Sequence, residues 1–139
     1  MEKLHLISAD TLFYQPLDHP KMLIDGILSN GLAILSGDSK IGKSWMVLWL
    51  CLKISLGEPV WGLPTAQTDV IYLALEDNDW RIQQRMQELI DEPPKNLHFG
   101  FSCGKLGAEL EGQIKGVLED NPNTGLLFID TLQMVRDNV

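Results

Sequence analysis

The sequence has 139 residues, of which 45% are hydrophobic and 22% are charged, so it can bury one hydrophobic core and form about one domain. Eleven basic and nineteen acidic residues give a net charge of -8, which opposes nonspecific binding to nucleic acids or anionic lipids. A membrane span is excluded because Lys53 interrupts the most apolar segment, and the N-terminus lacks a signal-peptide pattern, so we expect a cytoplasmic protein without membrane contact.

The N-terminal quarter contains two different predicted features. Residues 1–30 carry scattered apolar side chains and are expected to form an arm or short helix that covers the edge of a sheet. From Gly31 the apolar run Leu32–Leu35 leads into Ser36 and Gly37, which is typical of a buried strand that enters a glycine loop. We therefore expect residues 31–139 to form one folded domain.

Helical and strand-like patterns alternate along the rest of the chain. A helix is predicted from Lys43 to about Leu56, ended by Gly57, and the helices that follow are predicted over residues 79–90 and 106–118. Further strands are predicted over residues 69–75, 97–99 and 126–130. Alternation of this kind predicts an α/β fold, with a mostly parallel sheet and helices on both faces.

A phosphate-binding motif occupies residues 37–44, which read G-D-S-K-I-G-K-S and match G-x-x-x-x-G-K-[ST]. In such a loop the backbone N–H groups point at phosphate oxygens, the lysine reaches the β and γ phosphates and the serine hydroxyl ligates Mg²⁺. The alternative is a glycine turn with a solvated lysine. The predicted nucleotide-binding residues are Gly37, Asp38, Ser39, Lys40, Ile41, Gly42, Lys43, Ser44 and Trp45, and the predicted ligands are ATP and Mg²⁺.

Carboxylates at the ends of two predicted strands complete the candidate site. Asp130 ends an apolar strand and is predicted to act with Ser44 on the metal side. Thr131 follows it, so the carboxylate that activates the attacking water must come from elsewhere. Glu76 is predicted to be this water-activating carboxylate, and Lys43 is the second predicted catalytic residue. Asp77 is the competitor for the role of Glu76, and both could instead be helix-capping anions.

Three runs of sequence resemble RecA-fold ATPases of the plasmid RepA helicase type. They are GLAILSGDSKIGKSWMVLWLCLKISLGEPVWG, DVIYLALEDNDWRIQQRM and LLFIDTL, and the resemblance covers roughly residues 20–135. It implies a hexameric, ATP-driven motor that acts on single-stranded or double-stranded DNA during replication of a mobile element. By position, Lys43 and Ser44 would hold phosphate and Mg²⁺, Glu76 would activate water and Asp130 would support the metal.

The resembled core continues well beyond its second acidic strand, whereas this chain ends soon after Asp130. We therefore expect an incomplete RecA-like core that binds nucleotide but turns it over poorly, because an arginine finger contributes about 10³ to 10⁵ in rate. In the resembled fold a later strand lies between the strands that correspond to residues 32–35 and 126–129, so these two segments are expected to lack their shared neighbour. Those two strands are expected to pair directly, to accept a strand from another copy, or to self-associate along the open edge.

Several weaker signals have more than one interpretation. Arg81 and Arg85 could contact nucleotide, but a solvated helix face with Arg85 near Glu88 is favoured. Trp45 and Trp49 lie on a helix expected to be buried and are predicted to pack in the core rather than to stack on bases.

The remaining unusual residues point to no separate chemistry. Trp61 and Trp80 could border the nucleotide. The three histidines lack metal-ligand spacing, and Cys51 and Cys103 are expected to be reduced, ordinary residues. Two rival functions stay open: a nucleotide-dependent switch of the same fold, and a small-molecule kinase, which the scarcity of arginines disfavours.

Overall fold

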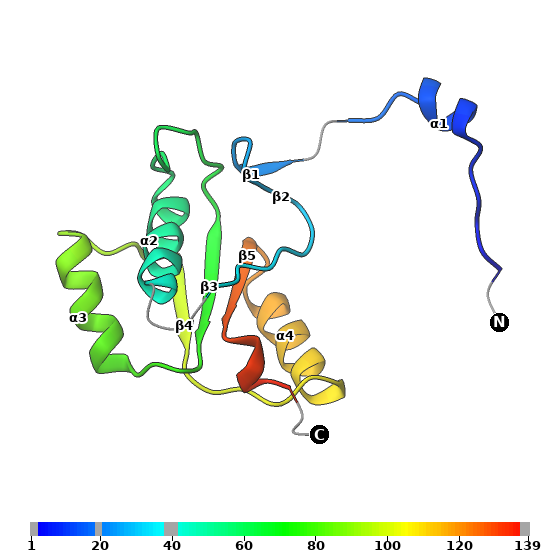
Figure 1. Cartoon of the computed structure of the whole chain (residues 1–139). Coiled ribbons are helices and arrows are strands. Elements are labelled where there is room, and N and C mark those ends of the chain that lie inside the picture. Colours follow the sequence, from blue (N-terminus) through cyan, green and yellow to red (C-terminus); the bar gives the residue numbers. More distant parts are fainter. Residues whose placement is uncertain (1–2, 19–20, 38–41, 137–139) are drawn as a thin grey trace.

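The computed structural model describes residues 3–18, 21–37 and 42–136, which form a small α/β body with an N-terminal extension (Figure 1). Three parallel strands make the central sheet in the order β4-β3-β5, and β1 and β2 form a separate antiparallel pair. The elements are α1 (Ala9–Tyr14), β1 (Met22–Ile24), β2 (Leu28–Ser29), α2 (Lys43–Leu56), β3 (Asp69–Ala74), α3 (Asp79–Leu89), β4 (Leu97–Gly100), α4 (Ala108–Asp120), β5 (Thr124–Asp130) and the 3₁₀ turn η1 (Leu132–Met134).

Helix α2 has the bounds that the sequence predicts. Gly42 at its N-terminus and Gly57 at its C-terminus have φ angles of 90° and 71°, in the left-handed region that glycine adopts without steric cost. The Gly57 N–H donates a hydrogen bond to the carbonyl of Ile54, which closes the last turn of the helix.

Within the described ranges, every helix is too short or too polar to span a bilayer.

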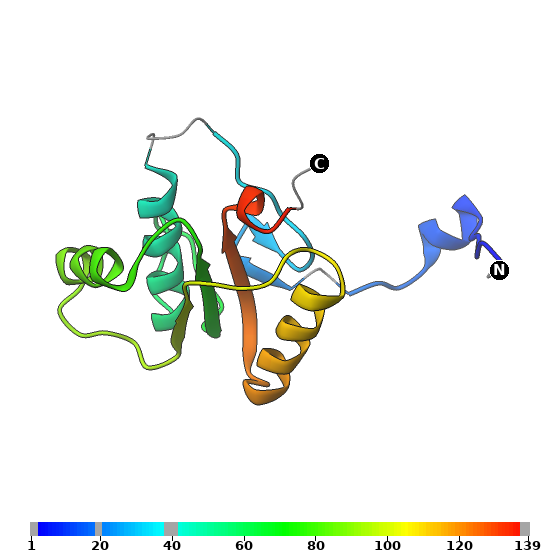
Figure 2. The same cartoon turned by 90° about the horizontal axis from the view of Figure 1, so that it is seen from below.

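The hydrophobic core lies between α2 and the sheet. Leu48, Leu52 and Ile54 of α2 are fully buried, as are Val70 and Tyr72 of β3. Burial on this scale supplies the main stabilisation of the fold, at roughly 1.5 to 3 kcal/mol per large apolar side chain. Figure 2 shows α2 and α3 on one side of the sheet and α4 on the other, which confirms helices on both faces.

The register of the sheet places two acidic segments at one edge. Ala74 of β3 pairs with Asp130 at the end of β5, and both strands run in the same direction. The residues that follow β3, beginning with Leu75 and Glu76, therefore emerge beside the residues that follow β5. This is the edge at which parallel α/β sheets place their ligands.

The strand predicted over residues 32–35 is not formed, so that prediction is wrong. The segment makes no strand pairing in this structure, and its side chains are exposed, with Leu32 at 95% and Ile34 at 77%. A strand requires a neighbour for its backbone groups, and in the described part of the chain the only partner of β5 is β3. Direct pairing of this segment with β5 is thus not observed, while self-association along the open edge stays a prediction.

Residues 1–30 contain both a packed and an exposed part. Ile24 of β1 is 1% exposed and belongs to the core, and the hairpin is fixed to the loop before β3 by hydrogen bonds of 2.9 Å between Asp25 and Pro64 and between Ala66 and Leu23. Helix α1 has no buried residue and lies apart from the sheet in both views (Figures 1 and 2). Covering of the sheet edge by residues 1–30 stays a prediction.

Candidate functional site

A cleft of about 720 Å³ opens at the edge of the sheet where β3 and β5 end. It collects the start of α2, the residues after both strands, and one side chain from α3. Its described lining is Leu35, Ser36, Gly37, Gly42, Lys43, Ser44, Trp45, Glu76, Arg85, Asp130, Thr131, Leu132 and Gln133. Residues far apart in the sequence and predicted to act on one ligand therefore share one cavity.

The described residues of the phosphate loop, Gly37 and residues 42–44, line this cleft. Lys43 is half-buried in the first turn of α2, and its ammonium donates a hydrogen bond to the backbone carbonyl of Gly37. The predicted contacts of Asp38, Ser39, Lys40 and Ile41 lie outside the described residues. A lysine held across its own loop is placed to exchange that carbonyl for phosphate oxygens, which are stronger, charged acceptors.

Ser44 and Asp130 meet on the floor of the cleft. The Ser44 Oγ donates to Asp130 Oδ2 at 2.8 Å, and the buried Tyr72 hydroxyl donates to the same oxygen at 2.9 Å. A hydroxyl and a carboxylate are hard oxygen ligands of the kind that Mg²⁺ prefers, and Mg²⁺ commonly takes one or two protein groups together with substrate phosphates. In the described ranges no three His, Cys, Asp or Glu side chains are grouped to hold a metal by themselves.

Glu76 lies exposed at the mouth of the cleft, beyond the end of β3. Its Oε1 accepts a hydrogen bond of 3.0 Å from the hydroxyl of Thr131. The carboxylate is therefore oriented by the residue that follows Asp130. Glu76 thus lies just beyond the end of β3, and Asp130 ends the neighbouring strand β5.

Asp77 is largely buried and lies beside two arginines. Its side chain is only 8% exposed and accepts a hydrogen bond of 2.6 Å from Arg85, while Arg81 lies 3.3 Å away. The helix cap is Asn78, whose Oδ1 accepts the Arg81 N–H at 2.9 Å. Neither Glu76 nor Asp77 is therefore the capping residue of α3.

The favoured interpretation of Arg85 as a solvated side chain near Glu88 is wrong. Arg85 is 17% exposed, and its guanidinium lies 5.1 Å from the centroid of the Trp45 ring. Helical spacing gave no sign of this, because the partners come from the loop before α3 and from another helix. The chemical signal that was available is the opposite charge of Asp77, just before this helix, and Arg85, within it.

The two tryptophans of α2 separate in the structure. Trp49 packs against the core and lies 5.5 Å from Trp61, as predicted for a buried aromatic. Trp45 is 37% exposed and lines the cleft, so its predicted burial in the core is wrong. Trp45 follows Ser44 in the first turn of α2, the part of the helix that lines the cleft.

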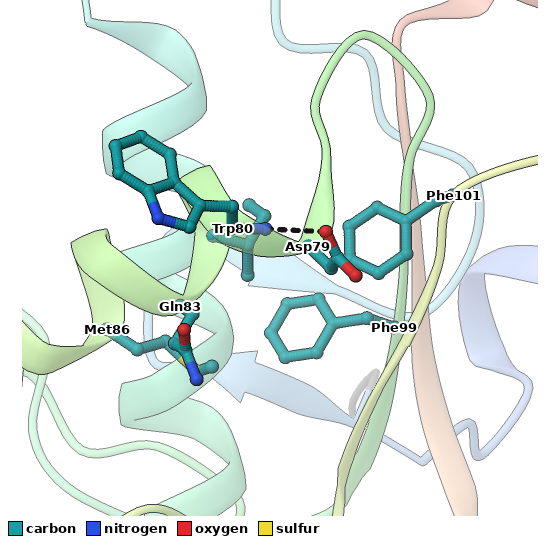
Figure 3. Close-up of a pocket in the computed structure, with 7 residues that line it drawn as sticks. Asp79, Trp80, Gln83, Met86, Phe99 and Phe101 are labelled. Atoms are coloured by element: carbon teal, nitrogen blue, oxygen red, sulfur yellow. Dashed lines mark hydrogen bonds between the residues drawn. The ribbon is translucent and has the colours of Figure 1, made fainter.

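A second cavity, of about 420 Å³, lies between α3 and β4 (Figure 3). Its lining is mainly apolar and consists of Asp79, Trp80, Ile82, Gln83, Met86, Phe99 and Phe101. Trp80 thus belongs to this cavity, and neither Trp80 nor Trp61 lines the phosphate cleft in the described structure.

Cys51 is a buried residue of the core. Burial raises the pKa of its thiol, which is consistent with an unreactive cysteine.

Comparison with known proteins adds one family match. Residues 2–138 match the AAA domain family, which covers nearly the whole chain and indicates a nucleotide-binding ATPase. This family generally uses ATP and Mg²⁺. No curated protein and no solved structure shows significant similarity to the chain.

Proposed function

The chain belongs to the AAA domain family of P-loop ATPases, and we propose that it is the ATP-binding part of a RepA-type helicase motor that hydrolyses ATP while acting on DNA. The observation that carries the ATPase part is the convergence of Lys43, Ser44, Glu76 and Asp130 on one cleft. The DNA-directed part rests on the sequence resemblance described above.

In the proposed reaction, Lys43 and the loop backbone bind the phosphates of ATP. Ser44 and Asp130 would hold Mg²⁺, which neutralises charge on the β and γ phosphates when bound. Glu76 accepts a proton from a water molecule as the water oxygen attacks the γ phosphorus and the bond to the β-phosphate oxygen breaks. The products are ADP and inorganic phosphate.

The experiment that tests the ATPase part is calorimetric titration of the chain with ATP and Mg²⁺, together with phosphate-release measurements. We expect saturable binding at one site per chain and slow turnover. Absence of binding to a folded chain would contradict the proposal. Binding without any turnover by the longest natural form of the protein would contradict the hydrolytic part.

The second candidate function is a nucleotide-dependent switch of the same fold that does not act on DNA. The net charge of -8 favours it, because an acidic protein repels the phosphate backbone. Turnover by the longest natural form, measured with and without single-stranded DNA, discriminates between the two functions. For a helicase motor we expect DNA to stimulate ATP turnover and the protein to elute as a hexamer in size-exclusion chromatography. For a switch we expect equal ATP turnover with and without DNA.

A further inference from the structure

Tyr72 connects the interior of the protein to the phosphate cleft. The residue lies in the middle of β3 with 0% of its surface exposed, and its ring packs between Phe99 and Phe128, with centroid distances of 5.8 and 6.4 Å. Its hydroxyl donates to Asp130 Oδ2 at 2.9 Å. Because neighbouring strands fix the ring on both sides, the position of the hydroxyl is fixed as well.

Asp130 receives two hydroxyl donors on the same carboxylate oxygen. Ser44 approaches Oδ2 from the first turn of α2, and Tyr72 approaches it from β3. In the proposed function the Ser44 hydroxyl also contacts the metal. Tyr72 does not line the cleft, and its hydroxyl reaches the site through Asp130.

The Tyr72 phenol is the donor in this contact, because a carboxylate oxygen accepts and a hydroxyl donates. A hydrogen bond to a charged group of this kind is about twice as strong as one between neutral groups.

We infer that Tyr72 is a positioning residue that orients the Asp130 carboxylate toward the Mg²⁺ expected at Ser44. The inference rests on the proposed function, because it concerns the same metal–nucleotide site. It predicts that removal of the Tyr72 hydroxyl weakens metal-dependent nucleotide binding and leaves metal-independent binding unchanged.

The experiment compares Tyr72→Phe with the wild-type chain. Calorimetry gives the affinity for ADP with Mn²⁺ and with excess EDTA, and electron paramagnetic resonance measures bound Mn²⁺ directly. We expect Tyr72→Phe to lower the affinity for Mn²⁺-ADP about tenfold and the affinity for ADP in EDTA less than twofold. Tyr14→Phe is the matched control, since Tyr14 is 81% exposed on α1, and it should match wild type in both measurements.

A double-mutant cycle with Asp130→Asn tests whether Tyr72 acts through Asp130. In the Asp130→Asn background, Tyr72→Phe should change Mn²⁺-ADP affinity by less than twofold. Equal Mn²⁺-ADP affinity of wild type and Tyr72→Phe would overturn the inference. So would a parallel loss in EDTA, or failure of Tyr72→Phe to fold, because the hydroxyl would then act on the fold as a whole. Wild-type chain that binds no nucleotide would instead overturn the proposed function and this inference together.

Discussion

The Thr131 hydroxyl donates a hydrogen bond of 3.0 Å to the Glu76 carboxylate, which joins the residues that follow β3 and β5 across the mouth of the phosphate cleft. Thr131 stands where a second acidic residue would follow Asp130 in many phosphate-loop ATPases. In this structure the acidic side chain nearest to Thr131 in this contact is Glu76, which follows the neighbouring strand β3. This arrangement leads to the first prediction.

Glu76→Gln is expected to preserve ATP binding and to lower turnover about a hundredfold, because the amide keeps the shape of the side chain but cannot accept the proton. Phosphate release by the longest natural form measures turnover, and calorimetry measures binding. Glu88→Gln removes a charge from an exposed position of α3 and serves as the control. If Asp77→Asn abolishes turnover while Glu76→Gln does not, the role belongs to Asp77.

Lys43→Ala is expected to weaken ATP binding about tenfold or more, because it removes a charge-assisted contact to phosphate worth about 1.5 to 3 kcal/mol. Isothermal calorimetry measures the affinity. The matched control is Lys53→Ala at the other end of α2, where Lys53 pairs with Glu58 at 2.7 Å outside the cleft. Equal ATP affinity of Lys43→Ala and Lys53→Ala, with both proteins folded, would sink the phosphate-loop assignment.

Arg85→Ala is expected to lower the free energy of unfolding by about 2 kcal/mol, because the Asp77 carboxylate would stay buried without its closest partner. Arg81, 3.3 Å from Asp77, compensates in part. Urea unfolding measures the loss. The control is Lys115→Ala, which breaks an exposed pair with Glu111 and should change stability by less than about 0.5 kcal/mol. Similar losses for the two variants would show that the Asp77–Arg85 pair contributes no more than a surface pair.

Alkaline pH is expected to destabilise the fold through Tyr72. Its pKa is raised from 10.0 by burial and by Asp130, so above about pH 10 the unfolded chain loses a proton that the folded chain keeps. The contribution of Tyr72 to the free energy of unfolding is therefore fully present below about pH 10. It falls by about 1.4 kcal/mol per pH unit as the pH rises further. The range from about pH 10.5 to about pH 11.5 lies just above the pKa of an unperturbed tyrosine. Over this range, urea unfolding should show that the free energy of unfolding declines less steeply for Tyr72→Phe than for wild type. Buried Cys51 contributes with the same sign in both proteins and cancels in the comparison. Parallel declines would disprove the effect.

Much of the fold could be predicted from local sequence patterns. The bounds of α2 follow from a continuous apolar segment between two glycines, and the start of α3 follows from the amide of Asn78. The alternation of strands and helices implies parallel strands, and parallel strands put Glu76 and Asp130 at one edge. The helix and strand patterns behind these conclusions are each formed by residues close together in the chain.

The tertiary structure alone decided features that depend on partners distant in the sequence. Residues 32–35 have the composition of a strand but remain unpaired, because strand formation needs a neighbouring backbone that composition does not supply. Trp45 faces the cleft although α2 is apolar nearly all round. The contacts of Arg85 with Trp45 and of Tyr72 with Asp130 join segments far apart in the sequence, which the packing of the helices and the sheet brings together. Periodicity assigns a residue to a face of its own element, whereas the side chain that it meets depends on where the other elements pack.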